Sequence, residues 1–548
     1  MVRRLGRLLT QPDLQALTFV LAFFSVVYRS AVWQGRHWLF ADNSFQNFPW
    51  HYWVFSHARH GGLTDPCQAM SLGFPLYAEP QAQCFYPFNT AWWPIGDPFV
   101  SFTVKMLLHM LAATVGMYVL ARQERRSPLA AAGAAVVMCG SSYMVYRVMH
   151  APILFGLAWL PWIVLLYLRA LRTGSRAAFV GMTLCAAMQI LAGHPQPVPY
   201  TVLICLILGL FSASAADGAA AGAVRRRALG LIAGAWGLAL VIAMVQLAPT
   251  YELYLYGARE AGDVGLVRQW GATLREVAVD FLGGLPIAVK AEKTAFIGTV
   301  AWVAVVYALW RGRDRRMRGW LTIALIGLVL SWVQGNPLYA VVAHVPVFDL
   351  LRAPSRIGLL LVFGAAMLVA DLLDRAREGQ WQPLLAAAAG VLVLLELVAL
   401  GATGKLGLGP IGPTDPLGWQ LVALIGFAAA VALAFRRGSP ARWFGPVVVL
   451  LMCAELLHFS EGVNPSYTTQ QWLAQPGQRI YEAAARCTQS DGTAFTRWQD
   501  GLPDNVAIYY GVPQPRSFTP AASPLTETVS TWFYGPSGFS SKYHYISA

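Results

Sequence analysis

The sequence has few charged residues for its length. Of 548 residues only 12% are Asp, Glu, Lys or Arg, whereas 56% are hydrophobic and the mean hydropathy is +0.49. A soluble domain carries about 25% charged residues, so this composition excludes a soluble globular enzyme and a disordered chain. Much of the surface must face lipid, and we expect an integral membrane protein.

Cysteine is also scarce. Seven cysteines in a chain of this length are too few for a disulfide scaffold. Four of them fall in apolar runs, where a thiol serves as a small apolar side chain: Cys139, Cys185, Cys205 and Cys453. Cys67 and Cys84 share one long loop, so either a bridge between them or two thiols fit the sequence, and Cys487 is the odd one.

Several signatures of soluble catalysis are missing. No Walker loop, dinucleotide fingerprint or nucleophile elbow occurs in a fitting context, which disfavours ATP-driven transport and the use of cytosolic nucleotide sugars. We also find no internal repeat of the kind that marks many secondary transporters.

Long apolar runs are abundant. A helix crossing the membrane needs about 20 mostly apolar residues, and we predict thirteen spans at 13–33, 99–121, 128–146, 151–170, 177–194, 197–214, 229–249, 295–310, 319–334, 357–373, 384–401, 418–435 and 443–460. The predicted fold class is therefore an all-α polytopic membrane protein.

Arginine marks every second connection between these spans. Cationic residues near span ends stay on the cytoplasmic side, and the clusters lie at 3–7, 122–126, 169–176, 225–227, 311–318, 375–377 and 436–442. This predicts a cytoplasmic N-terminus, retained as the first span, and an extracytoplasmic C-terminus. It also accounts for the net charge of +13 without a basic face for nucleic acid.

With this topology, most of the polar residues lie on the extracytoplasmic side of the membrane. We expect a transmembrane domain over 1–460 with long outer loops at 34–98, 250–294 and 335–356, and a mixed extracytoplasmic segment over 461–548. Chemistry is to be sought in these outer parts.

Asp42 stands where the first span leaves the membrane. A carboxylate at that depth is costly unless it faces water or a partner, so it is a functional candidate. The alternative is that Asp42 caps the helix that begins at Asn43.

The first outer loop is rich in amides and aromatic rings. Aromatic planes with amide and carboxylate groups line carbohydrate sites, although Trp and Tyr also belt membranes. A membrane belt explains the aromatic residues but not Glu79, Gln81 and Asn89 among them. Our substrate-binding candidates in this loop are Glu79 and Gln81, together with Gln46 and Tyr86, which lie in the motifs described next.

Motifs along most of the chain resemble the YfhO-type bacterial membrane protein family. In the first outer loop they are Asp42 through Gln46 with Pro49, Gly62-Leu63, Gly73-Phe74-Pro75, Gln81 and Phe85-Tyr86-Pro87. Later ones are Gly193-His194-Pro195-Gln196, Phe296-Ile297-Gly298, Phe348 to Arg356, Asp504-Asn505 and Tyr509-Tyr510-Gly511-Val512. Thr64-Asp65-Pro66 departs from the family's tryptophan-asparagine-proline, and the outer C-terminal portion is shorter than the family's.

This resemblance implies a GT-C-like glycosyltransferase in the bacterial inner membrane that uses a polyprenyl-phosphate sugar. It also implies that Asp42 is the catalytic carboxylate, which would deprotonate an acceptor hydroxyl. The leaving phosphate requires cations, and the candidates near spans are Arg147, Arg259, Arg268, Arg352 and Arg356. Arg352 and Arg356 would together grip phosphate oxygens, or else anchor to lipid headgroups.

Three further residues are weaker candidates. His194 and Gln196 occupy a tight outer turn and would contact phosphate or sugar, although a lone histidine is more often structural. Glu252 leaves a span as Asp42 does and is a second acid, a metal ligand, a cap or an ion-pair partner. His57 and His60, with His51 and Asp65 nearby, would suit a transition metal, although no cysteine or HExxH pattern accompanies them. Mg²⁺ or Mn²⁺ would fit if Asp42 converges with Glu79 or Glu252.

We therefore expect transfer of a sugar from a polyprenyl-phosphate donor to a cell-envelope acceptor on the outer face, with inversion. The alternative is a transporter or lipid flippase, to which the span residues Lys105 and His109 point. A third interpretation is a scaffold protein whose tail binds partners.

Overall fold

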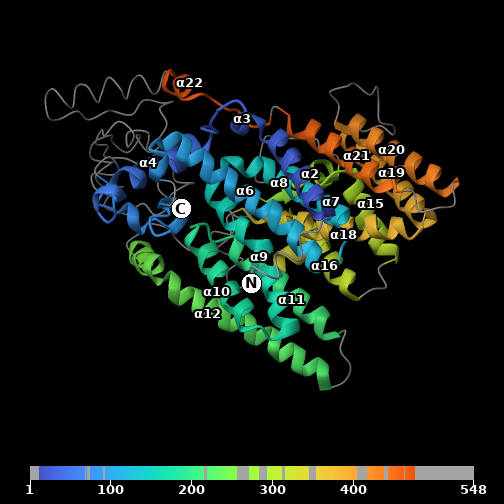
Figure 1. Cartoon of the computed structure of the whole chain (residues 1–548), viewed down its shortest axis with the longest axis horizontal. Coiled ribbons are helices and arrows are strands. Elements are labelled where there is room, and N and C mark those ends of the chain that lie inside the picture. The colour runs from blue at the N-terminus through green and yellow to red at the C-terminus, as the bar shows by residue number, and fades with distance from the viewer. Residues whose placement is uncertain are drawn as a thin grey trace.

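The computed structural model describes residues 11–67, 70, 74–90, 93–214, 219–255, 271–282, 293–311, 315–342, 344, 353–379, 381–403, 416–436, 442–461 and 463–475. Almost all regular structure in these residues is helical (Figure 1). One pair of short parallel strands joins β1 (Ala272–Thr273) to β2 (Trp332–Gln334).

Each predicted apolar run coincides with a helix. The long helices are α2 (Gln11–Val27), α6 (Pro98–Gln123), α7 (Pro128–Gly140), α9 (Ala151–Thr173), α10 (Arg176–Leu191), α11 (Pro197–Ser214), α12 (Ala219–Leu255), α15 (Thr299–Arg311), α16 (Arg315–Ser331), α18 (Leu359–Arg377), α19 (Trp381–Thr403), α20 (Pro416–Arg436) and α21 (Phe444–Ser460). In the described part, six segments have the length and composition to cross a membrane: Pro98–Gln123, Pro128–Met149, Ala151–Thr173, Ala220–Leu255, Pro354–Arg377 and Gly418–Phe435. The other apolar helices have 10–17 residues, so the count of thirteen crossings stays a prediction.

Shorter elements connect these helices. They are α3 (Arg29–Val32), α4 (Phe48–His57), α5 (Pro87–Thr90), α8 (Ser142–Tyr146), α14 (Leu274–Val277), α17 (Pro337–Val342) and α22 (Thr469–Leu473), the 3₁₀ turns η2 (Ala58–His60), η3 (Leu76–Ala78), η4 (Pro80–Ala82), η5 (Trp93–Ile95), η6 (Arg147–Met149) and η9 (Pro354–Gly358), and the π-helical turns η1 (Asn43–Asn47) and η7 (Ala278–Leu282).

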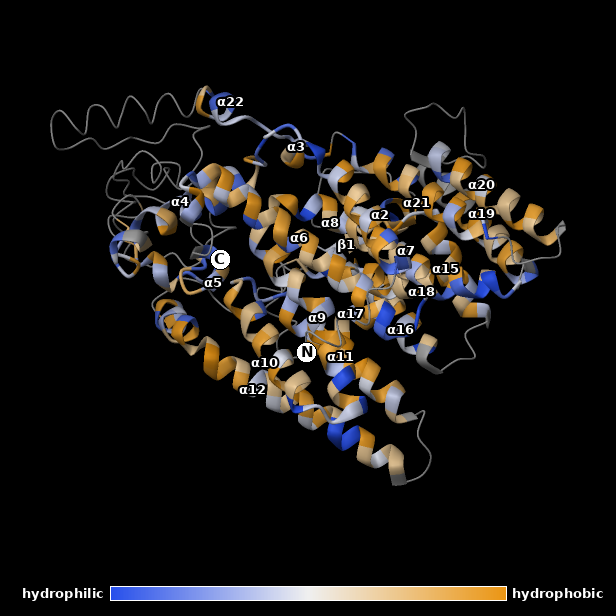
Figure 2. Ribbon diagram, in the orientation of Figure 1, coloured by the Kyte–Doolittle hydropathy of each residue, from blue (hydrophilic) through white to orange (hydrophobic). Residues whose placement is uncertain are grey.

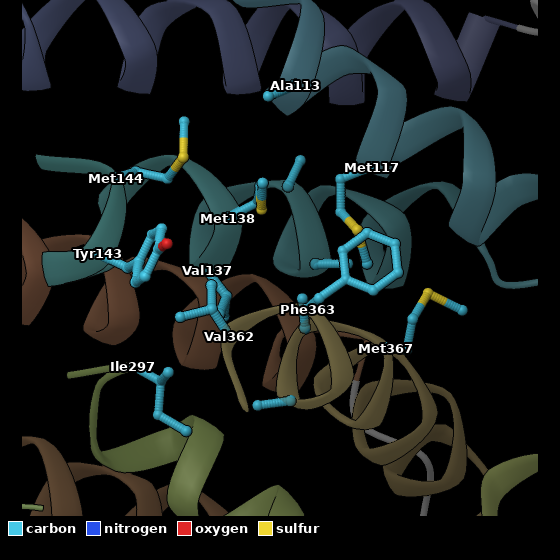
Figure 3. Packing of buried hydrophobic residues seen from close by; sticks show 14 of the residues in the cluster. Ala113, Met117, Val137, Met138, Tyr143, Met144, Ile297, Val362, Phe363 and Met367 are labelled. Atoms are coloured by element: carbon cyan, nitrogen blue, oxygen red, sulfur yellow. The ribbon is translucent and has the colours of Figure 1, made fainter. Parts of the chain in front are cut away.

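Helix α18 lies at the centre of the core. In the segment Pro354–Arg377, 94% of the most apolar 18-residue window is buried, and α18 packs against α7, α15 and α16. In Figure 3, Val362 of α18 lies beside Val137 of α7, and the Phe363 ring points toward Met117 of α6. A Cβ on Gly364 would lie 2.6 Å from the Trp320 carbonyl oxygen of α16, so a small residue permits this close helix approach.

The outer helices present apolar surface. Figure 1 shows α10, α11 and α12 on one side of the central helices and α19, α20 and α21 on another. Only 33% of the best window in Ala220–Leu255 is buried, and its outward face is apolar (Figure 2). Such a face belongs in lipid, and the chain is an integral membrane protein.

Ion pairs hold several of the arginine-rich connections. Arg122 Nε lies 2.6 Å from Asp13 Oδ1, and Arg172 Nη1 lies 2.6 Å from Glu124 Oε1. Asp371 forms two ion pairs, with Arg126 Nη1 2.8 Å from its Oδ1 and Arg375 Nε 2.7 Å from its Oδ2. These arginines therefore bind the helix bundle itself, while the predicted orientation is untested.

The first outer loop folds into a compact cap. Its buried cluster includes Trp50, Trp53, Cys67 and Cys84. Both cysteines are free thiols here, so the structure favours two thiols over the bridge. The boundary of the transmembrane domain at 460 stays a prediction, because only 463–475 and Glu461 are described beyond it.

Candidate functional site

Asp42 begins a π-helical turn at the end of the first span. Its side chain is 41% exposed, and Oδ2 lies 3.6 Å from Nε2 of the buried His150. The side chain makes no capping hydrogen bond, so the cap interpretation lacks its defining contact. The preceding Ala41 has a φ of 46°, a left-handed conformation that alanine rarely adopts and that often occurs at functional sites.

Asn43 fixes this turn to the segment that carries His150. Its Nδ2 donates to the carbonyl oxygens of Trp38 at 2.9 Å and Val148 at 2.8 Å. The η6 turn and the start of α9 therefore hold His150 beside Asp42.

Arg147 selects the tautomer of a neutral His150. This arginine is fully buried, stacks 4.8 Å from the Tyr143 ring, and has Nη1 3.3 Å from His150 Nδ1. A guanidinium only donates, so Nδ1 must accept and a neutral imidazole carries its proton on Nε2. That N–H faces the Asp42 carboxylate, with Nε2 3.6 Å from Oδ2.

A second cationic cluster contains three of the predicted residues. Arg356 Nη1 donates to Gln196 Oε1 at 2.7 Å and lies 3.2 Å from His194 Nε2. Gln196 Nε2 donates in turn to the Ala353 carbonyl oxygen at 3.2 Å. The turn between α10 and α11 thus meets the segment that opens α18.

Tyr200 of α11 lies near both clusters. It is 1% exposed and lies within electrostatic range of Arg147 and Arg356, as well as Tyr143 and Tyr339. The sequence named Arg147 only as one of several outer cations and missed Tyr200, because nothing in a span sequence marks which tyrosine lies between two arginines.

The first outer loop docks onto the turn that carries His194. Gln83 Nε2 donates to the Ala192 carbonyl oxygen at 2.8 Å. Gly193 has a φ of +91°, and a Cβ there would lie 2.0 Å from the Pro80 carbonyl oxygen. Glu79 is buried, and its Oε1 accepts from Gln81 N at 3.1 Å, so this carboxylate shapes the η4 turn.

The remaining candidates lie apart from these clusters or are inaccessible. The Tyr86 hydroxyl is bound to His109 Nε2 at 2.6 Å and Trp159 Nε1 at 2.9 Å, and burial raises the pKa of this phenol. Gln46 is buried in η1, and Glu252 is exposed near the end of α12. Arg352, Arg259 and Arg268 lie outside the described residues.

No group of three or more His, Cys, Asp or Glu that could hold a metal occurs among the residues the structure describes. His57 Nδ1 lies 3.0 Å from the Trp53 carbonyl oxygen and its ring stacks on Trp53, and His51 contacts Lys105 and Asn89. Dependence on Mg²⁺ or Mn²⁺ stays a prediction.

The fold resembles solved structures at low sequence identity. The crystal structure of ArnT from Cupriavidus metallidurans bound to undecaprenyl phosphate matches with a TM-score of 0.50 and 14% identity, covering 91% of this chain and 85% of that chain. The apo-state structure of the same protein matches with a TM-score of 0.49 and 12% identity, covering 91% and 84%. No family model matches the sequence, and no curated protein matches it. The predicted all-α, GT-C-like fold is confirmed.

Proposed function

We propose that this protein is a membrane glycosyltransferase, related to the YfhO-type family, that moves a sugar from a polyprenyl-phosphate carrier to a cell-envelope acceptor outside the membrane. The fold supports the donor class, because the similar ArnT structure is described as bound to undecaprenyl phosphate. The proposed location is the bacterial inner membrane.

Asp42 would act as the general base. Its side chain is 41% exposed beside His150, so it is accessible to an acceptor hydroxyl. The hydroxyl oxygen would form a bond to the anomeric carbon, the bond from that carbon to the phosphate oxygen would break, and the proton would move to Asp42. Direct displacement inverts the anomeric configuration.

Arg356 and Arg147 would stabilise the leaving phosphate. Arg356 is half-buried, so its guanidinium can approach phosphate oxygens while Gln196 and His194 orient it. Arg147 is fully buried and would contribute charge at a distance. Fixed positive charge near a developing negative charge lowers the barrier, most strongly where water is excluded.

The observation that carries this proposal is the Asp42 carboxylate beside His150 Nε2, without a capping role. The test is transfer from a synthetic polyprenyl-phosphate sugar by membranes containing wild type, Asp42→Asn or Asp65→Asn. Asp65 is an exposed aspartate of the same loop and serves as the matched control.

We expect Asp42→Asn to lower the rate by at least about 100-fold, in the range that general acid–base catalysis contributes. Asp65→Asn should retain the wild-type rate at equal protein levels. If Asp42→Asn turned over donor at the wild-type rate, Asp42 would not be the catalytic base. If no donor supported transfer by any of the proteins, a transporter, flippase or scaffold would be favoured.

A further inference from the structure

A group of arginines gathers where α9 ends and α10 and α12 begin. Arg169 and Arg172 lie in the last turns of α9, Arg176 is the first residue of α10, and Arg225 and Arg226 follow within about two turns of the start of α12. Helix α12 packs against both α9 and α10. Three helix ends therefore bring positive charge to one edge of the bundle, on the predicted cytoplasmic side.

Arg227 fixes the start of α12 to the turn between α9 and α10. Its Nη2 donates to the Ala170 carbonyl oxygen at 2.9 Å, and a Cβ on Gly174 would lie 2.6 Å from the same nitrogen. Further along the two helices, a Cβ on Gly234 of α12 would lie 3.3 Å from Cζ of Phe179 of α10. Both contacts show that α10 and α12 run side by side from the same edge.

The arginines of these two helices lie at the depth of lipid headgroups. Arg176 precedes Phe179 by three residues and Arg226 precedes Gly234 by eight, so at 1.5 Å per residue the two levels differ by about 7 to 8 Å. The polar headgroup region is about 5 to 8 Å thick on each side of a bilayer. Both guanidinium groups can therefore lie within that region at once.

Most of these arginines lack a carboxylate partner. Arg172 is paired, with Nη1 2.6 Å from Glu124 Oε1. Arg176, Arg225 and Arg226 are exposed and form no ion pair with any residue that the structure describes. Clustered like charges repel one another, and an anionic group bound among them would relieve that repulsion.

Apolar side chains continue from the arginines along the same helix faces. Residues four apart on a helix share a face. On α10, Arg176 is followed at successive turns by the exposed Val180 and Leu184. On α12, Arg225 is followed one turn later by the exposed Leu229. Each helix thus presents a cation at its end and then apolar surface.

The face of α12 that carries Arg226 also lacks bulky side chains. Gly230 and Gly237 lie one and three turns further along this face, and at both a Cβ would meet nothing within 4 Å. The exposed Leu238 and Val241 border the strip. Figure 2 shows the change from hydrophilic to hydrophobic ribbon along α12. An acyl chain can lie along such a smooth apolar strip.

We propose that this edge is a binding site for an anionic phospholipid of the surrounding membrane. Arg176 and Arg226 hold its phosphate, Arg225 adds charge, and its acyl chains lie along the exposed faces of α10 and α12. A free phosphate ion would use the arginines but not the apolar strips. The site lies on the predicted side opposite Asp42, so the proposal is independent of sugar transfer.

The binding test uses purified full-length protein in nanodiscs of phosphatidylcholine alone or of equal parts phosphatidylcholine and phosphatidylglycerol with the same acyl chains. Native mass spectrometry identifies the lipids that stay bound, and thermal unfolding is followed in both membranes. A basic residue near an anionic lipid surface contributes about fivefold in affinity. We expect wild type to retain phosphatidylglycerol by more than about tenfold over phosphatidylcholine, and to unfold at a higher temperature in its presence.

The double variant Arg176→Gln with Arg226→Gln removes the two proposed phosphate ligands and should lose most of this preference. The control is Arg377→Gln with Arg442→Gln. It removes the same charge from two exposed arginines on the same predicted side, and it should retain the wild-type preference.

A second variant keeps every arginine. A Cβ on Gly222 would lie 3.7 Å from Arg226 Nη1, so Gly222→Glu supplies a carboxylate that competes with the lipid phosphate for Arg226. Glutamate also favours a helix more than glycine does, so this variant remains informative if the double variant does not fold. We expect it to lower the preference by about fivefold.

The proposal is overturned if wild type retains the two lipids equally, or if the double variant and Gly222→Glu both keep the wild-type preference. Inorganic phosphate added to phosphatidylcholine nanodiscs separates a lipid site from an ion site. A midpoint shift equal to that from phosphatidylglycerol would show a site for free phosphate and overturn the lipid assignment. Because no readout uses sugar transfer, a failure of the proposed glycosyltransferase activity leaves these outcomes unchanged.

Discussion

The buried imidazole of His51 makes stability depend on pH. Its pKa in the folded protein is well below the value of about 6.5 in the unfolded chain, because burial and the Lys105 ammonium both oppose protonation. Below about pH 6.5 the unfolded state therefore binds more protons, and stability falls as the pH falls.

We predict that the thermal unfolding midpoint of wild type decreases between about pH 7.5 and pH 5, and that His51→Asn has a smaller decrease. The exposed His344 supplies the control variant His344→Asn, which should keep the wild-type pH dependence. A wild-type slope in His51→Asn would show that other groups cause the effect.

For single residues, the sequence suggested candidates for the site but not the contacts that they make. Asp42 was recognisable because a carboxylate at a span end is unusual, and the motif around His194, Gln196 and Arg356 became one cluster in the structure. His150 and Tyr200 were not predicted, since their roles depend on helices that are distant in sequence. The predicted role of Tyr86 in substrate binding stays a prediction, and the structure adds that its hydroxyl is bound by His109 and Trp159.

The junction between the first outer loop and the turn after α10 depends on Gly193. We predict that Gly193→Ala destabilises the protein and abolishes transfer, because the new methyl group would meet the Pro80 carbonyl oxygen in addition to about 1–2 kcal/mol of left-handed backbone strain. Thermal unfolding and the transfer assay measure both effects.

Gly61 offers the matched comparison. Its φ is +78°, but a Cβ there meets nothing within 4 Å. Gly61→Ala should therefore show the strain alone and retain transfer. Similar losses in the two variants would mean that the contact with Pro80 is unimportant.

Segment 463–475, near the C-terminal end of the described chain, packs against the first outer loop and the start of α6. Tyr467 and His37 exchange backbone hydrogen bonds of 2.7 and 2.9 Å, and α22 lies at the same edge of the molecule as α3 and α4 (Figure 1). Trp472 is fully buried, with its ring 5.4 Å from Phe48 and 5.6 Å from Phe99. Phe48 directly follows the π-helical turn of Asp42, so this contact supports the candidate site.

We predict that Trp472→Ala lowers the free energy of unfolding by about 3–5 kcal/mol, the cost of removing a buried aromatic side chain. Denaturant unfolding in detergent measures the change. Trp33→Ala, at a position 72% exposed, should cost less than about 0.5 kcal/mol. Comparable losses would contradict a specific role for Trp472.

The helices themselves were predictable and their connections were not. Apolar runs located every long helix because a spanning backbone must satisfy its own hydrogen bonds. The short turns of the first outer loop, the π-helix at Asn43–Asn47 and the return of 463–475 to His37 are fixed by long-range contacts, which local hydropathy does not report.

For the whole molecule, the arginine pattern predicts one orientation. In a Cys487→Ser background, Thr64→Cys should react with an impermeant maleimide on intact cells, and Thr173→Cys should react only after permeabilisation, because the two exposed positions lie on opposite predicted sides. The opposite labelling would reverse the topology and put Asp42 on the cytoplasmic side.

The architecture also explains why the chemistry belongs at one face. The Asp42 turn, the His194 turn and the start of α18 come from distant parts of the sequence, yet hydrogen bonds link the His194 turn to both the first outer loop and Arg356. A lipid-linked donor would reach such a site from the bilayer, with its phosphate near the arginines and its sugar near Asp42.

The most direct measurement of the central claim is product formation by purified wild type in proteoliposomes supplied with either a polyprenyl-phosphate sugar or a nucleotide sugar. The account predicts glycosylated acceptor from the lipid-linked donor only, and only when that donor is accessible at the arginine-poor face. Product from the nucleotide sugar, or movement of the lipid-linked donor across the bilayer without transfer, would contradict it.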